Sequence, residues 1–143
     1  MLDFSRSAET QPLLIVDDDE PFRNRLARAM EKRGFAVTTA ASVAEGCDVA
    51  RRDKPTYAVL DLRLEDGSGL EIVKELQGSQ PEARIIVLTG YGNIATTVAA
   101  VKAGAIDYLP KPADADAVAA ALLERENALP PPPENPMSAD RVK

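Results

Sequence analysis

Residues 13–20 read LLIVDDDE, so four apolar residues lead directly into four acidic ones. Crowded carboxylates repel one another, and burial at the end of a strand makes their charged forms costlier still. Such a stretch therefore predicts a bound cation that offsets the repulsion. Carboxylates suit a hard divalent ion such as Mg²⁺, whereas zinc is usually held by His and Cys. Because the chain has no His and only one Cys, we expect Mg²⁺ as its cofactor.

Three further polar residues follow other apolar runs. Asp61 interrupts YAVLDL at a position typical of a buried strand, where a carboxylate needs a partner. Thr89 follows RIIVL and offers a hydroxyl donor, while Lys111 can neutralise the charge of a phosphoryl group. An Asp carboxylate can itself accept a phosphoryl group, so Asp61 is the candidate nucleophile. The sequence has no Gly-Lys-Ser/Thr loop and therefore predicts no ATP cradle.

These residues need elements that bring them together. Strand-length apolar runs alternate with helical segments, a pattern typical of an α/β fold with a parallel sheet. We expect a doubly wound, flavodoxin-like (βα)5 sandwich, a five-stranded parallel sheet with strand order 2-1-3-4-5. The carboxyl ends of such strands share one edge, where open α/β sheets bind ligands. The runs are LLIV from Leu13, FAV from Phe35, YAVLDL from Tyr57, RIIVL from Arg84 and AIDYL from Ala105.

Helix signals lie between these runs. The first helix has Pro21 near its start, and the second opens with Ser42 and Glu45, which form a capping-box pair. A glycine-rich loop precedes the third helix. The fourth helix is expected to begin near Asn93 and the fifth near Asp114.

The composition fits one globular domain. The chain has 143 residues, 45% of them hydrophobic, and a net charge of −6, which argues against nucleic-acid binding by this segment itself. No apolar run is long enough to span a bilayer, so we expect no membrane partner. The start, MLDFSRSAETQP, lacks the pattern of a signal peptide, and we therefore expect a cytoplasmic protein.

The ends of the chain differ from its middle. We expect a disordered N-terminal segment over residues 1–11, a folded domain over 12–128 and a proline-rich linker over 129–143. The run Pro130–Pro133 favours an extended polyproline spacer. A spacer that leads nowhere would be odd, so we expect it to connect to a further domain that this chain lacks.

Four motifs carry a family resemblance when they are taken together. VDDDE, YAVLDLRLEDGSGLE, VLTGYG and DYLPKP occur in an order and spacing that resemble the receiver domain of two-component response regulators. The resemblance implies that Asp61 is the phosphoacceptor. It also implies that Asp18 and Asp61 bind Mg²⁺ directly, that Asp17 holds it through water, and that the main-chain carbonyl of Arg63 is a further ligand.

The same resemblance implies a switch. Thr89 would bond a phosphoryl oxygen and Lys111 would pair with the phosphate, so both would act with the phosphoacceptor in catalysis. Tyr108 would be the aromatic switch residue, and the peptide bond before Pro112 would be cis. The expected partners are a sensor histidine kinase and, on phosphorylation, a second copy that pairs through the fourth helix, fifth strand and fifth helix. We expect no enzymatic activity beyond self-phosphorylation from a phosphodonor and autodephosphorylation.

A narrower resemblance covers RLARAMEKRGF, DLRLEDGSGL, LTGYGNIATTVAAVK and PPPPENPMSADRV, which are similar to the RegA/PrrA/ActR family of redox-responsive transcriptional regulators. In that family the linker leads to a helix-turn-helix domain, so DNA would be a partner only through that domain. Pro110 departs from the usual small residue before Lys111. Because proline lacks an N–H, we expect the last strand to end by Leu109. Cys47 is expected to be a small core residue.

Two other classes fit parts of the pattern. Asp17 and Asp19 form a DxD pair like that of haloacid-dehalogenase-type phosphohydrolases, in which Asp17 would be the nucleophile of a magnesium-dependent small-molecule phosphohydrolase. However, Pro21 stands where that motif has Thr or Val, and little room is left for a cap domain. A flavodoxin-type flavin module needs a loop rich in hydroxyl and amide groups after the first strand, where this chain has acids.

Overall fold

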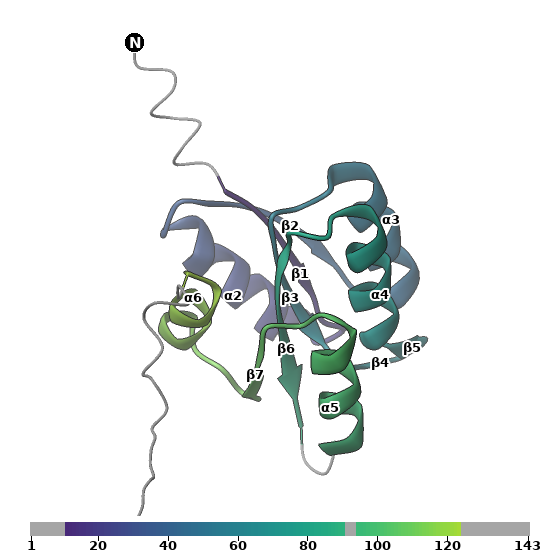
Figure 1. Cartoon of the computed structure of the whole chain (residues 1–143). Helices are drawn as coiled ribbons and strands as arrows, with labels where there is room; N and C mark the ends of the chain where they lie inside the picture. The colour runs from purple at the N-terminus through teal and green to yellow at the C-terminus, as the bar shows by residue number, and fades with distance from the viewer. Residues whose placement is uncertain (1–10, 91–93, 124–143) are drawn as a thin grey trace, which may run out of the picture.

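The computed structural model describes residues 11–90 and 94–123, and its framework is a five-stranded parallel sheet (Figure 1). The strands follow the order β2-β1-β3-β6-β7 across the sheet. Counted along the chain, this is the order 2-1-3-4-5, so the predicted fold is confirmed. The five strands are β1 (Gln11–Val16), β2 (Phe35–Ala40), β3 (Tyr57–Asp61), β6 (Arg84–Thr89) and β7 (Asp107–Pro110).

Helices cover both faces of this sheet. One layer is formed by α2 and α6, and the other by α3, α4 and α5 (Figure 1). This arrangement makes the structure a three-layer sandwich, in which the carboxyl ends of the strands lie together at one edge of the sheet. The helices are α2 (Glu20–Glu31), α3 (Val43–Asp53), α4 (Leu70–Ser79), α5 (Ile94–Ala103) and α6 (Ala115–Leu123).

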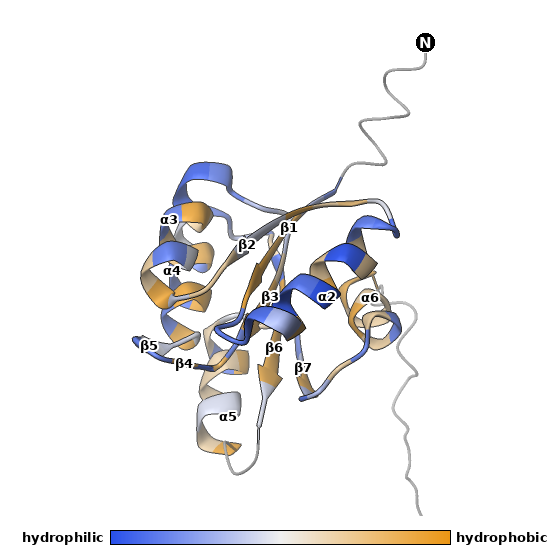
Figure 2. Ribbon diagram, turned by 180° about the vertical axis from the view of Figure 1, so that it is seen from behind, coloured by the Kyte–Doolittle hydropathy of each residue, from blue (hydrophilic) through white to orange (hydrophobic). Residues whose placement is uncertain are grey.

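Alternate residues of the central strands face opposite helical layers. In β1, Leu13 and Ile15 pack with the α2 and α6 layer, whereas Leu14 and Val16 pack with the other layer. All four side chains are at most 1% exposed. Both faces of the sheet are therefore buried, which explains the nearly unbroken apolar runs. Figure 2 shows these strands as largely hydrophobic and much of α2 as hydrophilic.

Side-chain caps fix the helix starts next to the strand ends. Asp19 caps α2 by accepting a 3.1 Å hydrogen bond from the N–H of Phe22, and Pro21 lies in the first turn. Ser42 caps α3 by accepting a 3.1 Å bond from the N–H of Glu45. The carboxylate of Glu45 accepts from the N–H of the residue before the cap, so the predicted capping pair is present in a slightly shifted form.

The last strand corrects one prediction. β7 spans Asp107–Pro110, so it begins later than Ala105 and includes Pro110 rather than ending by Leu109. Pro110 pairs with Thr89, and the ladder bond at this point runs from the N–H of Lys111 to the carbonyl of Thr89 at 2.8 Å. The missing N–H of Pro110 therefore falls on the open side of an edge strand, where proline is tolerated.

The loop after β3 contains a short hairpin that the sequence did not predict. β4 (Arg63–Leu64) pairs with β5 (Gly67–Ser68) in antiparallel fashion. Gly67 has φ of +153°, a conformation that favours glycine. Leu64 is only 6% exposed and anchors the hairpin in the core beside α3. The glycine-rich segment is thus an ordered part of the fold.

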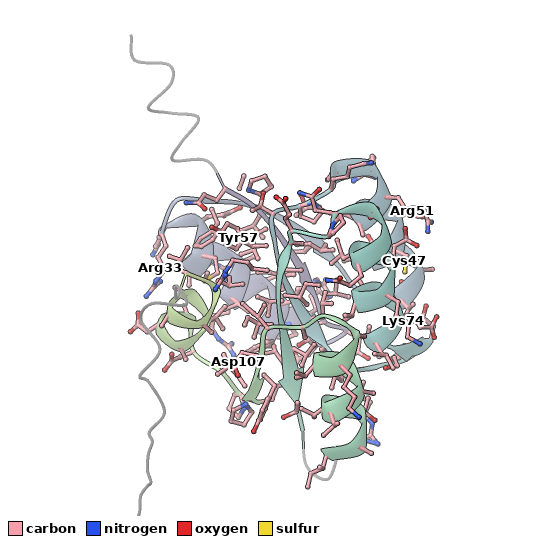
Figure 3. The ribbon with its side chains drawn as sticks, viewed as in Figure 1. Arg33, Cys47, Arg51, Tyr57, Lys74 and Asp107 are labelled. Atoms are coloured by element: carbon pink, nitrogen blue, oxygen red, sulfur yellow. The ribbon has the colours of Figure 1, made fainter. Side chains whose placement is uncertain are left out.

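Cys47 lies on α3 at the edge of the core, as predicted for a small residue (Figure 3). It is partly buried, and burial raises the pKa of its thiol, with a smaller contribution from the charge of Glu75 on α4. The thiol is therefore held mainly in its protonated form at neutral pH.

The remaining expectations concern the ends of the domain, the start of α5 and membrane spans. β1 begins at Gln11, one residue before the expected domain boundary. The N-terminal segment over residues 1–10, Asn93 and the linker over 129–143 lie outside the described residues. None of the helices within the described ranges is both long and apolar enough to cross a bilayer.

Candidate functional site

Two carboxylates occupy the buried ends of neighbouring strands. Asp17 directly follows β1 and is completely buried, and Asp61 is the last residue of β3 and only 5% exposed. Because β1 and β3 pair in parallel, their carboxyl ends meet at the same edge. Asp18 follows Asp17 and is exposed at this edge.

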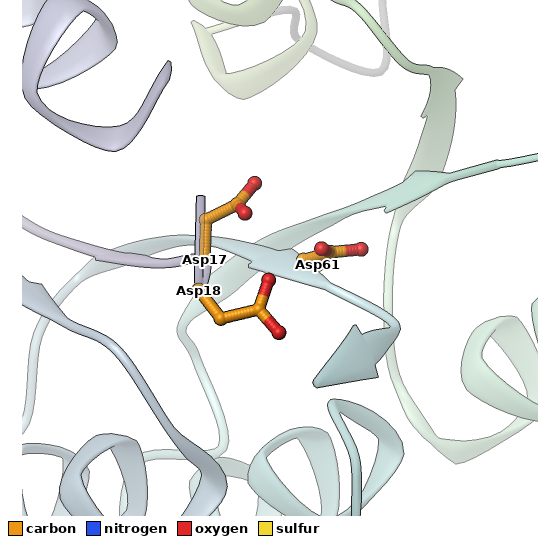
Figure 4. A group of neighbouring side chains, drawn as sticks. All are labelled: Asp17, Asp18 and Asp61. Carbon is orange, nitrogen blue, oxygen red and sulfur yellow. The ribbon is translucent and has the colours of Figure 1, made fainter. Parts of the chain in front are cut away.

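These three aspartates form one cluster. Asp17, Asp18 and Asp61 each offer a carboxylate oxygen, and the three oxygens lie within 4.8 Å of one another. Figure 4 shows the three side chains gathered at the ends of their strands. A set of carboxylate oxygens without nitrogen or sulfur donors suits a hard divalent cation. The side chains that the sequence predicted as metal ligands therefore come together, and their chemistry fits Mg²⁺.

Lys111 contacts two of these carboxylates. It follows β7, and its Nζ lies 2.9 Å from Oδ2 of Asp17 and 3.1 Å from Oδ2 of Asp61. Its side chain is 24% exposed, so the ammonium lies at the boundary between the core and solvent. The peptide bond between Lys111 and Pro112 is cis, which is the geometry that the resemblance implied.

The electrostatics of the cluster favour a further cation. Burial and then the charge of Asp17 raise the pKa of Asp61, and the opposing effects of the Arg63 N–H and Lys111 do not cancel this rise. Burial lowers the pKa of Lys111, but its bond to Asp17 and the charges of both buried carboxylates outweigh burial and raise it. Lys111 thus remains an ammonium facing an excess of carboxylates, and a divalent cation would relieve their repulsion.

The β4–β5 hairpin forms one wall of the site. The N–H of Arg63 donates a 3.2 Å hydrogen bond to Oδ1 of Asp61. A pocket of about 500 Å³ opens beside this contact. The lining residues are Asp18, Asp19, Asp61, Arg63, Leu64, Glu65, Gly90 and Lys111.

Thr89 and Tyr108 line a different, adjoining pocket. This second pocket also measures about 500 Å³, lies between β6, β7 and α5, and meets the acidic pocket at Gly90. Thr89 ends β6 and is partly buried, whereas Tyr108 in β7 is 51% exposed. The expected switch pair thus lies together, next to the acidic cluster rather than within it. The remaining lining is formed by Ile94, Thr97, Val98, Val101 and Lys102 of α5.

Two contacts at the site were missed by sequence reasoning. The ring of Phe22 lies 5.1 Å from Nζ of Lys111, a distance that suits a cation–π interaction. Arg23 donates a 2.9 Å hydrogen bond through Nη1 to the carbonyl of Asp17, which ties α2 to the end of β1. Neither Phe22 nor Arg23 was predicted from the sequence to be part of the site.

Comparison with known proteins agrees with this geometry. A family model described as the response regulator receiver domain matches residues 13–123. The chain belongs to this family. The photosynthetic apparatus regulatory protein RegA of Cereibacter sphaeroides is 66% identical over 92% of this chain and 71% of its own length. The acid tolerance regulatory protein ActR of Rhizobium meliloti is 63% identical over 92% of this chain and 68% of its own length.

A solved structure has the same fold. A response regulator protein from Burkholderia pseudomallei, crystallised with a phosphorylated aspartic acid, a calcium ion and citrate, matches with a TM-score of 0.75. It is 45% identical, and the match covers 82% of this chain and 68% of that one. The chain is thus a receiver domain of the RegA and ActR type and takes part in two-component signalling and transcription regulation. The family match does not favour the phosphohydrolase alternative.

Proposed function

We propose that this receiver domain takes a phosphoryl group from a sensor histidine kinase onto Asp61. The observation that carries the proposal is the convergence of Asp17, Asp18, Asp61 and Lys111 at one sheet edge, with three carboxylate oxygens within 4.8 Å of one another. Bound Mg²⁺ would be held by Asp18, Asp61 and the main-chain carbonyl of Arg63, and through water by Asp17.

The transfer is a displacement at phosphorus. A carboxylate oxygen of Asp61 attacks the phosphoryl group of the kinase phosphohistidine, the P–N bond breaks as the new P–O bond forms, and the imidazole nitrogen leaves and takes up a proton. Mg²⁺ supplies charge neutralisation for the phosphoryl oxygens. The Lys111 ammonium, which already contacts Asp61, stabilises the same negative charge. Water later hydrolyses the acyl phosphate and restores the Asp61 carboxylate.

The phosphoryl group then biases two packings of the domain. The acyl phosphate carries about 1.5–2 negative charges, by analogy with other phosphorylated side chains, in place of the single charge of the Asp61 carboxylate, and the Thr89 hydroxyl bonds one of its oxygens. Tyr108 then turns into the adjoining pocket that Thr89 partly vacates. This is a population shift, because the phosphoryl group favours one of two accessible arrangements through differential contacts.

The switch is proposed to have two outputs, a dimer interface on the domain and the control of a further domain. We infer that the changed surface of α5, β7 and α6 favours a homodimer. The segment over residues 129–143 is proposed to be a linker to a DNA-binding domain, through which the receiver controls transcription in response to redox conditions. The domain itself then acts as a cytoplasmic switch whose only chemistry is its own phosphorylation and dephosphorylation.

Acetyl phosphate with MgCl₂ or with EDTA tests the acceptor assignment, with intact-protein mass spectrometry as the readout. We expect one phosphoryl adduct on the wild-type chain, formed only with Mg²⁺, and none on Asp61→Asn. Asp48→Asn is the matched control because Asp48 is an exposed aspartate on α3 that pairs with Arg51. It should be labelled like the wild type. A stable adduct on Asp61→Asn would show that another residue is the acceptor.

Size-exclusion chromatography tests the switch. Beryllofluoride mimics the phosphoryl group, so addition of beryllofluoride with Mg²⁺ is expected to shift the wild-type chain towards the dimer. Tyr108→Ala should bind beryllofluoride but give a smaller shift. An unchanged elution volume of the wild-type protein under saturating beryllofluoride would contradict phosphorylation-driven dimerisation.

A further inference from the structure

The carboxylate of Asp66 joins the turn of the β4–β5 hairpin to the first turn of α3. Oδ1 accepts a 2.8 Å hydrogen bond from the N–H of Val43, and Oδ2 accepts a 3.2 Å bond from the N–H of Ala44. N–H groups in the first turn of a helix have no partner within the helix. The bond from Val43, supported by that from Ala44, lowers the pKa of Asp66, so the tether is ionised at neutral pH.

Local caps of α3 do not replace this contact. Ser42 accepts a hydrogen bond from the N–H of Glu45, and the Glu45 carboxylate accepts one from the residue before the cap. These two bonds use the N–H groups of Ala41 and Glu45 and leave those of Val43 and Ala44 to Asp66. The hairpin and the helix are thus joined by a long-range contact, formed by residues that are 22 and 23 positions apart.

The other side of the same hairpin faces the acidic pocket. Arg63, Leu64 and Glu65 line that pocket, and the N–H of Arg63 donates to Oδ1 of Asp61 at 3.2 Å. The hairpin strands have two residues each, so their own ladder gives little rigidity. The position of the Arg63 main chain relative to Asp61 therefore depends on what holds the hairpin from outside.

We propose that Asp66 is a positioning residue for the metal and phosphoryl site. By binding α3 it holds the hairpin so that the Arg63 N–H meets Asp61 and the Arg63 carbonyl faces the aspartate cluster. The inference rests on the proposed function, in which that carbonyl is a Mg²⁺ ligand. Loss of the tether weakens Mg²⁺ binding although every ligand remains, while the buried Leu64 keeps the hairpin in the fold.

Titration of the full chain with MgCl₂, followed by calorimetry, tests this role. We expect Asp66→Ala to raise the dissociation constant of Mg²⁺ about tenfold, the lower end of the range for groups that orient a metal ligand. Asp66→Asn should fall between this variant and the wild type, because its amide oxygen can accept one of the two bonds. Hydrogen exchange by NMR should show faster exchange at the amides of Val43, Ala44 and Arg63 in Asp66→Ala.

Ser42→Ala is the matched control. It removes a cap from the same helix but leaves the contact between Asp66 and α3, so it should lose similar stability in urea and bind Mg²⁺ within about twofold of the wild type. A purely structural role for Asp66 would give equal Mg²⁺ affinities in the two alanine variants. The rate of phosphorylation by acetyl phosphate adds a second readout. Asp66→Ala should need more Mg²⁺ for its half-maximal rate and approach the wild-type rate at saturation.

Mg²⁺ titrations of the wild-type chain and of Asp18→Asn separate this inference from the proposed function. If the wild-type chain binds Mg²⁺ and Asp18→Asn loses this affinity, the Mg²⁺ site itself is established. If Asp66→Ala then binds like the wild type and protects the Arg63 amide equally, Asp66 does not position the site, although the proposed function stands. If the wild-type chain fails to bind Mg²⁺, the proposed function and this inference both fall.

Discussion

Lys111 donates two hydrogen bonds to Asp17 although 94 positions separate them in the sequence, with Nζ 2.9 Å from Oδ2 and 3.2 Å from Oδ1. The contact crosses the sheet edge from the end of β7 to the end of β1. It gives a fully buried carboxylate its ionic partner. The same ammonium reaches Asp61, so one cation serves two buried acids and leaves the cluster short of positive charge.

Replacement of Lys111 by Met should tighten Mg²⁺ binding and destabilise the metal-free protein. The ammonium and Mg²⁺ repel each other, and for charges several ångströms apart this repulsion is worth about 1–2 kcal/mol even in water, or about tenfold in affinity. Without its partner, Asp17 becomes an unpaired buried charge, so we expect a loss of about 2–4 kcal/mol in EDTA. Calorimetric titration and urea unfolding measure the two effects. Weaker Mg²⁺ binding by Lys111→Met would contradict this account of the cluster.

Asp61→Asn should stabilise the metal-free fold at neutral pH. The pKa of Asp61 is raised in the folded state by burial and by Asp17, so its stabilising contribution is complete only below its unfolded pKa. That contribution is lost as the pH rises through the folded pKa, because the ionised form is the costly one. In EDTA the variant should therefore unfold at higher urea concentration than the wild type at pH 7. The difference should shrink towards about pH 4, near the ordinary pKa of Asp.

Cys47 should react slowly with alkylating reagents in the folded protein. Burial raises the pKa of its thiol, and the thiolate is the reactive species. At pH 7.5 we expect iodoacetamide to label Cys47 at least about fivefold more slowly than it labels the same chain in urea. Mass spectrometry of timed samples gives both rates. Equal rates would show an exposed, reactive thiol and contradict the effect of burial.

Much of the fold and the acidic cluster followed from the sequence because topology alone brings strand ends together. Once β1, β3 and β7 are recognised as parallel strands of one sheet, the residues that follow them must lie along its carboxyl edge. Asp17, Asp61 and Lys111 were predicted in this way. The nearness of these residues depends on the order of strands and not on the details of packing.

The contacts that support the cluster depend on details that sequence patterns do not encode. The β4–β5 hairpin has strands of two residues, too short for a periodic signal, so its contact from Asp66 to α3 could not be foreseen. Pro110 was misjudged because the direction in which its missing N–H would point depends on strand register. Arg23 reaches the carbonyl of Asp17, a main-chain group that leaves no trace in the side-chain pattern.

Replacement by alanine should have opposite effects on stability at two glycines, Gly69 just before α4 and Gly78 within it. A Cβ on Gly69 would lie 2.3 Å from the carbonyl oxygen of Asp61 and 3.1 Å from its carbonyl carbon, so the backbone that carries Asp61 would have to move. We expect Gly69→Ala to cost about 1–3 kcal/mol, the range for overpacking, and to weaken Mg²⁺ binding. A Cβ on Gly78 meets no atom within 4 Å, so Gly78→Ala should stabilise the helix by about 0.5–1 kcal/mol. Urea unfolding of both variants measures the difference in stability. Equal unfolding midpoints would mean that the loop after β3 moves to accommodate the added methyl group and does not hold Asp61 in place.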